Sequence, residues 1–174
     1  DATIAAQVVK GSVVVVVGRA NLAEDDSFTM AALDAVMAAA PNATVLPVIR
    51  RGNVRGAIET GLVTGSTTSI LRSAAAGKIN CLILLGADPI ADVRDTELAR
   101  QAMAAVQHVI AIDTFASSSS QRADVLFPAA AFGEKDGTTT NLEGRVTQLN
   151  RKVNVHGTAR PDWMIALELA DYLG

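Results

Sequence analysis

The sequence has one cysteine, Cys81, and two histidines, His108 and His156. One cysteine excludes an internal disulfide, a four-cysteine iron–sulfur cluster and a cysteine-rich zinc site within these 174 residues. Each histidine stands alone, where a structural or solvent-exposed role is more common than metal binding. Cys81 lies inside the apolar run 80–86, which predicts a buried, unreactive thiol. The residues therefore indicate no metal site.

Basic charge and long apolar runs are also scarce. The formal net charge is −3 at pH 7 and the pI is about 5.3, so no basic excess favours nucleic acid or an anionic membrane surface. No stretch approaches the roughly 20 apolar residues that cross a bilayer, and no basic-then-apolar leader opens the chain. Because the chain starts at Asp1 and ends in or just after a helical pattern, we expect a domain excised from a longer polypeptide.

Common phosphate-binding and hydrolase motifs are missing as well. The segment "GRANLAED" follows the first apolar run without the G-x-G-x-x-G of a dinucleotide fold. The segment "AAAGK" lacks the earlier glycine of a P-loop and its following Ser or Thr. No G-x-S-x-G elbow is present. These absences disfavour a free-standing nucleotide-binding module and a serine hydrolase.

The apolar composition points to a fold class. Aromatic residues make up only 3% of the chain and hydrophobic residues 49%, so the core is expected to consist of Ala, Val, Leu and Ile. Such residues typically fill the space between helices and a parallel sheet. At 18.0 kDa the chain is large enough for one domain with its own core. We therefore predict a single α/β domain over residues 1–174.

Alternating patterns refine this prediction. Five short apolar runs predict strands, at 12–18, 44–49, 80–86, 108–113 and 123–129. Helical patterns occupy 25–41, 67–78, 92–106 and 160–174, whereas 50–66 is glycine-punctuated and irregular. The alternation predicts a Rossmann-like three-layer sandwich: a mostly parallel sheet of about five strands with helices on both faces. The first run is typical of a strand buried on both faces, and Pro47 favours an edge position or a strand end for the second.

Ligands of such folds bind at the carboxyl ends of the strands, which here carry 18–19, 86–89, 113–120 and the polar stretch 131–146. The run "SSSS" at 117–120 offers either a phosphate site at a helix start or simple capping of a short helix, and capping is favoured.

The polar stretch 131–146 contains three carboxylates and two nearby cations. This mixture favours an ordered, salt-linked structural loop over a catalytic carboxylate site. Gly137 and Asn141 are natural turn formers, so both are expected in turns. The charged residues are Glu134, Lys135, Asp136, Glu143 and Arg145.

A long motif resembles a known family. The run "DTFASSSSQRADVLFPAAAFGEKDGTTTNLEGRV", residues 113–146, resembles the molybdopterin oxidoreductase family. The segments "LLGADP", "RRGNVRGAIETGL" and "RPDWMIALELADYLG" are similar to further segments of the same family. In active members, the regions that match 86–89 and 113–119 lie near a pterin guanine dinucleotide. The resemblance thus implies cofactor-binding positions at Gly86, Asp88, Pro89, Asp113, Thr114, Ser117 and Ser119.

Within the family, "AAAFGEKDGTTTNLEGRV" is most similar to the G subunit of bacterial NADH-quinone oxidoreductase, respiratory complex I. That resemblance implies a scaffold with a vestigial site and no redox centre or cofactor of its own. Iron–sulfur clusters would lie in an N-terminal part of the parent chain. Its partners would be other domains of that chain and other complex I subunits, peripherally bound at the cytoplasmic side of the bacterial plasma membrane.

The sequence leaves one alternative open. The chain also fits the corresponding domain of an active molybdenum oxidoreductase, such as a formate dehydrogenase or a nitrate reductase. There the same residues would hold molybdopterin guanine dinucleotide. Thr139 and Leu142 depart from the pattern of many relatives, so pterin contacts are not expected in that loop.

Overall fold

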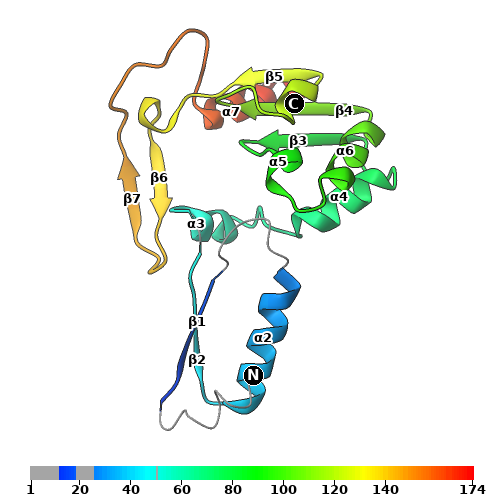
Figure 1. Ribbon diagram of the computed structural model, residues 1–174. Coiled ribbons are helices and arrows are strands. Elements are labelled where there is room, and N and C mark those ends of the chain that lie inside the picture. Colours follow the sequence, from blue (N-terminus) through cyan, green and yellow to red (C-terminus); the bar gives the residue numbers. More distant parts are fainter. Residues whose placement is uncertain (1–11, 19–25, 50) are drawn as a thin grey trace.

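The computed structural model describes residues 12–18, 26–49 and 51–174. It contains two parallel sheets and one antiparallel hairpin (Figure 1). The first sheet pairs β1 (Val14–Val17) with β2 (Thr44–Pro47). The second has the order β3 (Cys81–Leu85), β4 (His108–Asp113), β5 (Val125–Pro128), and the hairpin pairs β6 (Gly137–Thr140) with β7 (Val146–Leu149).

Helices connect the parallel strands, which confirms the predicted α/β class. None of the helices in the described residues is long and apolar enough to cross a membrane. Two short 3-10 helices, Ser120–Arg122 and Phe132–Glu134, follow β4 and β5. The α-helices of the described residues are α2 (Asp26–Ala39), α3 (Val54–Glu59), α4 (Thr67–Ala75), α5 (Pro89–Asp92), α6 (Thr96–Ala105) and α7 (Asp162–Leu173).

The expected five parallel strands are all present, but they are divided between two sheets instead of one. In Figure 1, β1, β2 and α2 lie below the three-stranded sheet, with α3 between the two parts. Val14 and Val16 are 61% and 63% exposed, so the predicted burial of the first strand on both faces is wrong. The two strands and one helix described for this part of the chain provide too few layers to cover both faces of a sheet. Pro47 is the last residue of β2, and among the described strands β2 pairs only with β1, so the expected strand end or edge position is confirmed.

The main core lies between the three-stranded sheet and two helices. Leu82 and Leu84 point from β3 into this core and are buried, while alternate residues of β3 face outward. Ala74 of α4 and Ala102 of α6 are fully buried, and such small side chains let the helices approach the sheet closely. A smaller cluster on the opposite face joins Ile112 with Ala129 and with Ile165 of α7.

The outer face of β3 is not covered by any described element. Ile83 and Leu85 on this face are 61% and 58% exposed. Cys81 belongs to the same face and is also exposed, so the predicted burial of its thiol is wrong. The cause is the position of β3 at the sheet edge, because the α7 cluster covers β4 and β5 instead.

Helix boundaries follow local capping groups. Gly77 has φ +68° and follows the end of α4, as predicted. The helix expected at 92–106 begins later, because the Asp95 carboxylate accepts the N–H of Leu98 at 3.0 Å and starts α6 at Thr96. The segment expected to be irregular, 50–66, contains the six-residue helix α3.

The polar stretch 131–146 forms most of a hairpin rather than an open loop. The Asn141 side chain accepts the N–H of Arg145 at 2.9 Å, and Gly144 takes φ +86°. Asn141 therefore lies at a turn as predicted. Gly137 does not, because it is the first residue of β6.

Three of the five charged side chains of this stretch have hydrogen-bond or ion-pair partners, whereas those of Glu143 and Arg145 have none within the described residues. Glu134 accepts the N–H of Ala131 at 2.8 Å, and Asp136 accepts the N–H of Arg151 at 2.8 Å. Lys135 pairs with Asp162 at the start of α7 at 2.8 Å. The stretch is thus ordered by hydrogen bonds and one ion pair, although two of these partners lie outside it.

The tip of the hairpin is attached to α3, beside which it lies in Figure 1. The Asn53 side chain accepts the N–H of Thr140 at 2.8 Å. Arg55 donates to the carbonyl of Leu142 and forms an ion pair with Glu59. An isolated two-stranded hairpin is marginally stable in water, so these contacts account for its fixed position.

Gly144→Ala is expected to destabilise the chain. A Cβ at Gly144 would lie 2.9 Å from a guanidinium nitrogen of Arg55, and φ +86° costs about 1–2 kcal/mol for a residue with a side chain. Thermal melting should show a fall of several degrees. Gly52→Ala is the control, because a Cβ at Gly52 would meet no atom within 4 Å and the φ of Gly52 is not positive. Equal melting temperatures for both variants would contradict the described turn.

Candidate functional site

Two loops meet at the carboxyl edge of the three-stranded sheet. The 86–89 turn follows β3, and residues 114–120 follow β4. The Gly86 N–H donates to the carbonyl of Ile112 at 2.8 Å, which extends the pairing one step beyond β3. Gly86 then takes φ +56°, a conformation that favours glycine, and directs the chain into α5. Parallel pairing therefore places the two loops side by side.

The Asp88 carboxylate joins these loops. Its Oδ1 accepts the N–H of Ser119 at 3.1 Å and also the Ser119 hydroxyl, and its Oδ2 accepts the N–H of Ser118 at 3.1 Å. Oδ1 further accepts the N–H of Ala91 at 3.3 Å, which caps α5. Converging backbone N–H groups and a hydroxyl form the kind of donor set that binds anions at turns. Residues 117–120 form a serine turn, and the Asp88 carboxylate lies where the donors of this turn would bind an anion.

The surroundings of Asp88 favour its charged form. Partial burial of the carboxylate raises its pKa, but the hydrogen bonds from the Ser119 hydroxyl and from the N–H groups of Ala91, Ser118 and Ser119 outweigh burial. The pKa of Asp88 is therefore held below its ordinary value. Asp88 is an anion at neutral pH.

Ser119 connects the Asp88 carboxylate to the core. The residue is fully buried, and its hydroxyl oxygen accepts the N–H of Ile90 at 3.0 Å while it donates to Asp88. Ser120 is buried as well, and its hydroxyl accepts both the N–H and the hydroxyl of Ser117, at 2.7 and 2.9 Å. The serine turn is consequently rigid, and its polar groups bind one another and Asp88.

Asp113 ends β4 and organises its own loop. Its Oδ1 accepts the N–H of Thr114 at 2.8 Å, and its carbonyl accepts the N–H of Ala129 at 2.9 Å. These bonds hold the start of the loop against the chain that leaves β5. The carboxylate thus acts locally in the described structure.

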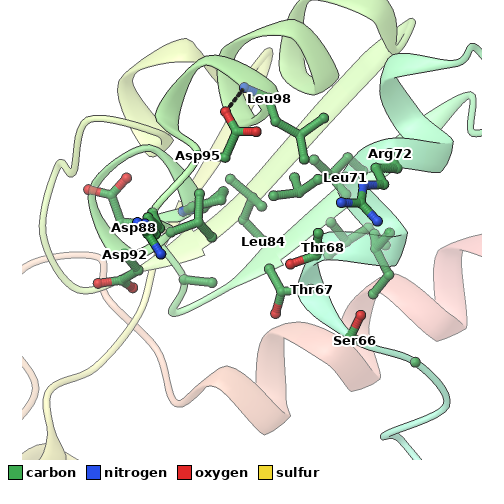
Figure 2. Close-up of a pocket in the computed structure, with 18 of the residues that line it drawn as sticks. Ser66, Thr67, Thr68, Leu71, Arg72, Leu84, Asp88, Asp92, Asp95 and Leu98 are labelled. Atoms are coloured by element: carbon green, nitrogen blue, oxygen red, sulfur yellow. Dashed lines mark hydrogen bonds between the residues drawn. The ribbon is translucent and has the colours of Figure 1, made fainter. Parts of the chain in front are cut away.

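A cleft of about 1360 Å³ opens beside the 86–89 turn and the exposed edge of β3. Figure 2 shows Asp88 and Asp92 on one side of it, and Thr67, Thr68 and Arg72 on the other. Leu84 and Leu71 lie between the two sides. The cleft exceeds the roughly 300–1,000 Å³ of typical small-molecule sites, so it has room for an extended ligand.

The walls of the cleft carry charges that are not neutralised by ion pairs. Arg51, Arg72 and Arg94 line it, and their guanidinium groups form no ion pair or hydrogen bond within the described part of the chain. The N-terminus of α4, capped by Ser66, adds the partial positive charge of a helix start. Cations of this kind favour an anionic group such as a diphosphate.

The residues predicted from the sequence divide into two groups. Gly86, Asp88 and Pro89 line the cleft. The other predicted positions belong to the neighbouring loop and do not line it; they are Asp113, Thr114, Ser117 and Ser119. Sequence reasoning missed Arg72 and Arg94, because a single arginine on a helix or in a short turn carries no motif.

Comparison with known proteins adds the family. Residues 8–172 match the family model described as molybdopterin oxidoreductase. The chain belongs to the molybdopterin oxidoreductase family. The match spans nearly the whole chain, so this molybdopterin oxidoreductase segment includes both sheets, the hairpin and α7.

Several members of the family are similar in sequence. The chain is 30% identical over 155 residues to the alpha subunit of an NADPH-Fe(3+) oxidoreductase from Geobacter sulfurreducens, covering 74% of this chain and 18% of that protein. It is 34% identical over 110 residues to the alpha subunit of an F420-dependent formate dehydrogenase from Methanococcus maripaludis, covering 63% and 16%. It is 37% identical over 98 residues to the assimilatory nitrate reductase catalytic subunit of Bacillus subtilis, covering 56% and 14%. The chain thus spans less than a fifth of each relative.

A solved structure supports the fold. Acetylene hydratase from Pelobacter acetylenicus superposes with a TM-score of 0.55 at 20% sequence identity, covering 60% of this chain and 15% of that one. At this identity the likeness concerns the fold alone. It agrees with an α/β architecture built on parallel strands.

Ser119→Ala is expected to reduce stability by about 1–3 kcal/mol, because it leaves the buried N–H of Ile90 without its acceptor and removes a donor to Asp88. Chemical denaturation measures the change. Ser118→Ala is the matched control: the Ser118 side chain is exposed, and only its backbone N–H binds Asp88. A Ser118→Ala variant as unstable as Ser119→Ala would contradict this geometry.

Proposed function

We propose that the chain is a cofactor-holding segment of an active molybdopterin oxidoreductase of the formate dehydrogenase and nitrate reductase kind. In this proposal the cleft beside the 86–89 turn accommodates the nucleotide end of a pterin guanine dinucleotide. The observation that carries the proposal is the presence of three unpaired guanidinium groups, within the described residues, on a large cleft at the carboxyl end of a parallel strand.

The residues around the cleft fit an anionic dinucleotide. Arg72 and Arg94 offer planar donors suited to phosphate oxygens, and the start of α4 adds hydroxyls at Thr67 and Thr68. Gly86 has open space around its Cβ position, so the backbone there permits close approach of a ligand. The exposed Ile83 supplies an apolar surface for a ring system.

In this proposal the residues of the chain bind and orient. Arg72 and Arg94 neutralise the diphosphate, Gly86 and Pro89 form the rim, and the apolar surface of β3 excludes water from one side. The cofactor supplies the redox-active metal in active members of the family. The proposal gives none of the described residues a role in proton transfer.

The relatives support an active molybdenum oxidoreductase of the formate dehydrogenase and nitrate reductase kind. Formate dehydrogenase and nitrate reductase subunits match over 55% or more of the chain, which favours an active molybdenum oxidoreductase over the G subunit of NADH-quinone oxidoreductase. The G-subunit interpretation stays a prediction. It includes the scaffold role in complex I, the partner subunits and the peripheral membrane location.

Guanosine diphosphate is a suitable probe of the nucleotide end. Titrated into the chain, it should raise the melting temperature in a saturable way, because ligands that bind only the folded state stabilise it. Arg72→Gln should weaken the affinity about tenfold or more, the effect of losing a charge-assisted hydrogen bond of roughly 1.5–3 kcal/mol.

Arg100→Gln is the matched control, because Arg100 is exposed on α6 and does not line the cleft. Its affinity for guanosine diphosphate should equal that of the wild type. The proposed function is overturned if the wild-type chain shows no saturable response at millimolar guanosine diphosphate, or if both arginine variants lose affinity equally.

A further inference from the structure

We propose that Asp88 is a positioning residue whose carboxylate acts as the internal anion of the serine turn and sets the rim of the cleft. The family resemblance makes Asp88 a candidate for direct contact with a cofactor; the geometry assigns its carboxylate to the protein instead. The part that concerns the rim rests on the proposed function. The part that concerns the serine turn does not.

The donors of the serine turn are already used. The N–H groups of Ser118 and Ser119 and the Ser119 hydroxyl all point at the two oxygens of Asp88. A phosphate from outside would have to displace a carboxylate that is covalently attached to the neighbouring loop. The serine turn therefore binds an anion, and that anion is a side chain of the same protein.

The attachment spans about 30 residues of sequence and connects two loops that the sheet alone only places nearby. Asp88 also caps α5 through Ala91, and Pro89 begins that helix. Through Ser119 the same unit contacts the N–H of Ile90 in the core. One carboxylate thus determines where the 86–89 turn lies, and this turn forms one wall of the cleft.

The neighbouring carboxylates do not have this role. Asp92 lines the same cleft, and its carboxylate has no hydrogen-bond or ion-pair partner within the described residues. The Asp113 carboxylate accepts hydrogen bonds only from the N–H groups of Thr114 and Phe115 in its own loop, as far as the described part of the chain shows. Asp92 is therefore a matched comparison, since its removal takes away the same charge from the same wall without breaking the attachment.

Chemical rescue distinguishes an internal anion from general destabilisation. Asp88→Ala retains the Cβ and removes the carboxylate, which formate replaces in size and charge. We expect the variant to melt about 4–10 °C below the wild type, because it loses the four hydrogen bonds that the carboxylate accepts from Ala91, Ser118 and Ser119. Sodium formate should then raise its melting temperature saturably, beyond the effect of sodium chloride at equal ionic strength.

Asp92→Ala and the wild type are the controls, and neither should respond to formate more than to chloride. If formate raises the melting temperature of Asp88→Ala by no more than it raises that of the controls, the assignment of the internal anion is overturned. If Asp88→Ala does not fold, Asp88→Asn serves in its place. It retains one acceptor oxygen but turns an N–H group toward Ser118, so its melting temperature should fall by about 2–4 °C; an unchanged value would overturn the assignment.

Guanosine diphosphate tests the rim separately. In Asp88→Ala its affinity should fall about tenfold and recover with formate, whereas Asp92→Ala should bind at least as tightly as the wild type, because it only removes a negative charge from the wall of the cleft. Unchanged affinity in Asp88→Ala refutes the positioning of the rim. If the wild-type chain does not bind guanosine diphosphate at all, the proposed function fails, and the formate response alone decides the role of Asp88 in the serine turn.

Discussion

The carboxylate of Asp88 is the interaction on which the candidate site depends. It accepts hydrogen bonds from Ala91, Ser118 and Ser119, and so it connects the loop after β3 to the loop after β4. Without it, the hydroxyl of fully buried Ser119 would lose its acceptor. Buried polar groups without partners cost about 1–3 kcal/mol each, so the carboxylate and the serine turn stabilise each other.

This constraint determines how the cleft can act on a ligand. Since Asp88 is engaged with the serine turn, the charges left for a ligand among the described residues include the guanidinium groups of Arg51, Arg72 and Arg94 and the carboxylate of Asp92. The cleft therefore presents three cations and one carboxylate next to the apolar edge of β3. Such a surface suits an anionic ligand with a ring system, which agrees with the cofactor chemistry proposed for this molybdopterin oxidoreductase segment.

The sequence predicts those features that depend on near neighbours. The strand at 108–113 and the end of α4 before Gly77 follow from β-branched residues and from a glycine that accepts positive φ. The division into two sheets could not be predicted, because a run of valines looks the same whether or not another strand lies beside it. For the same reason the exposure of Cys81 was missed, since burial depends on which element covers the outer face of β3.

The candidate site also depends on contacts between residues that are far apart in the sequence, which local patterns do not predict. The 86–89 turn, which the family resemblance singles out, lines the cleft, but the partners of Asp88 lie about 30 residues away and depend on the parallel pairing of β3 with β4. Arg72 reaches the cleft only because α4 packs beside β3. The sequence does not distinguish the hairpin from a loop, because its threonines and turn residues also suit irregular structure.

Amide hydrogen exchange at the serine turn tests the central claim most directly. In the wild-type chain the amides of Ser118, Ser119 and Ile90 should exchange far more slowly than in an unfolded chain, because each donates to a fixed acceptor. In Asp88→Ala the amides of Ser118 and Ser119 should lose this protection. Val109, whose N–H donates to the separate carboxylate of Asp124, should keep its own. Ser118 and Ser119 amides that exchange in the wild type at the unfolded-chain rate would contradict the account.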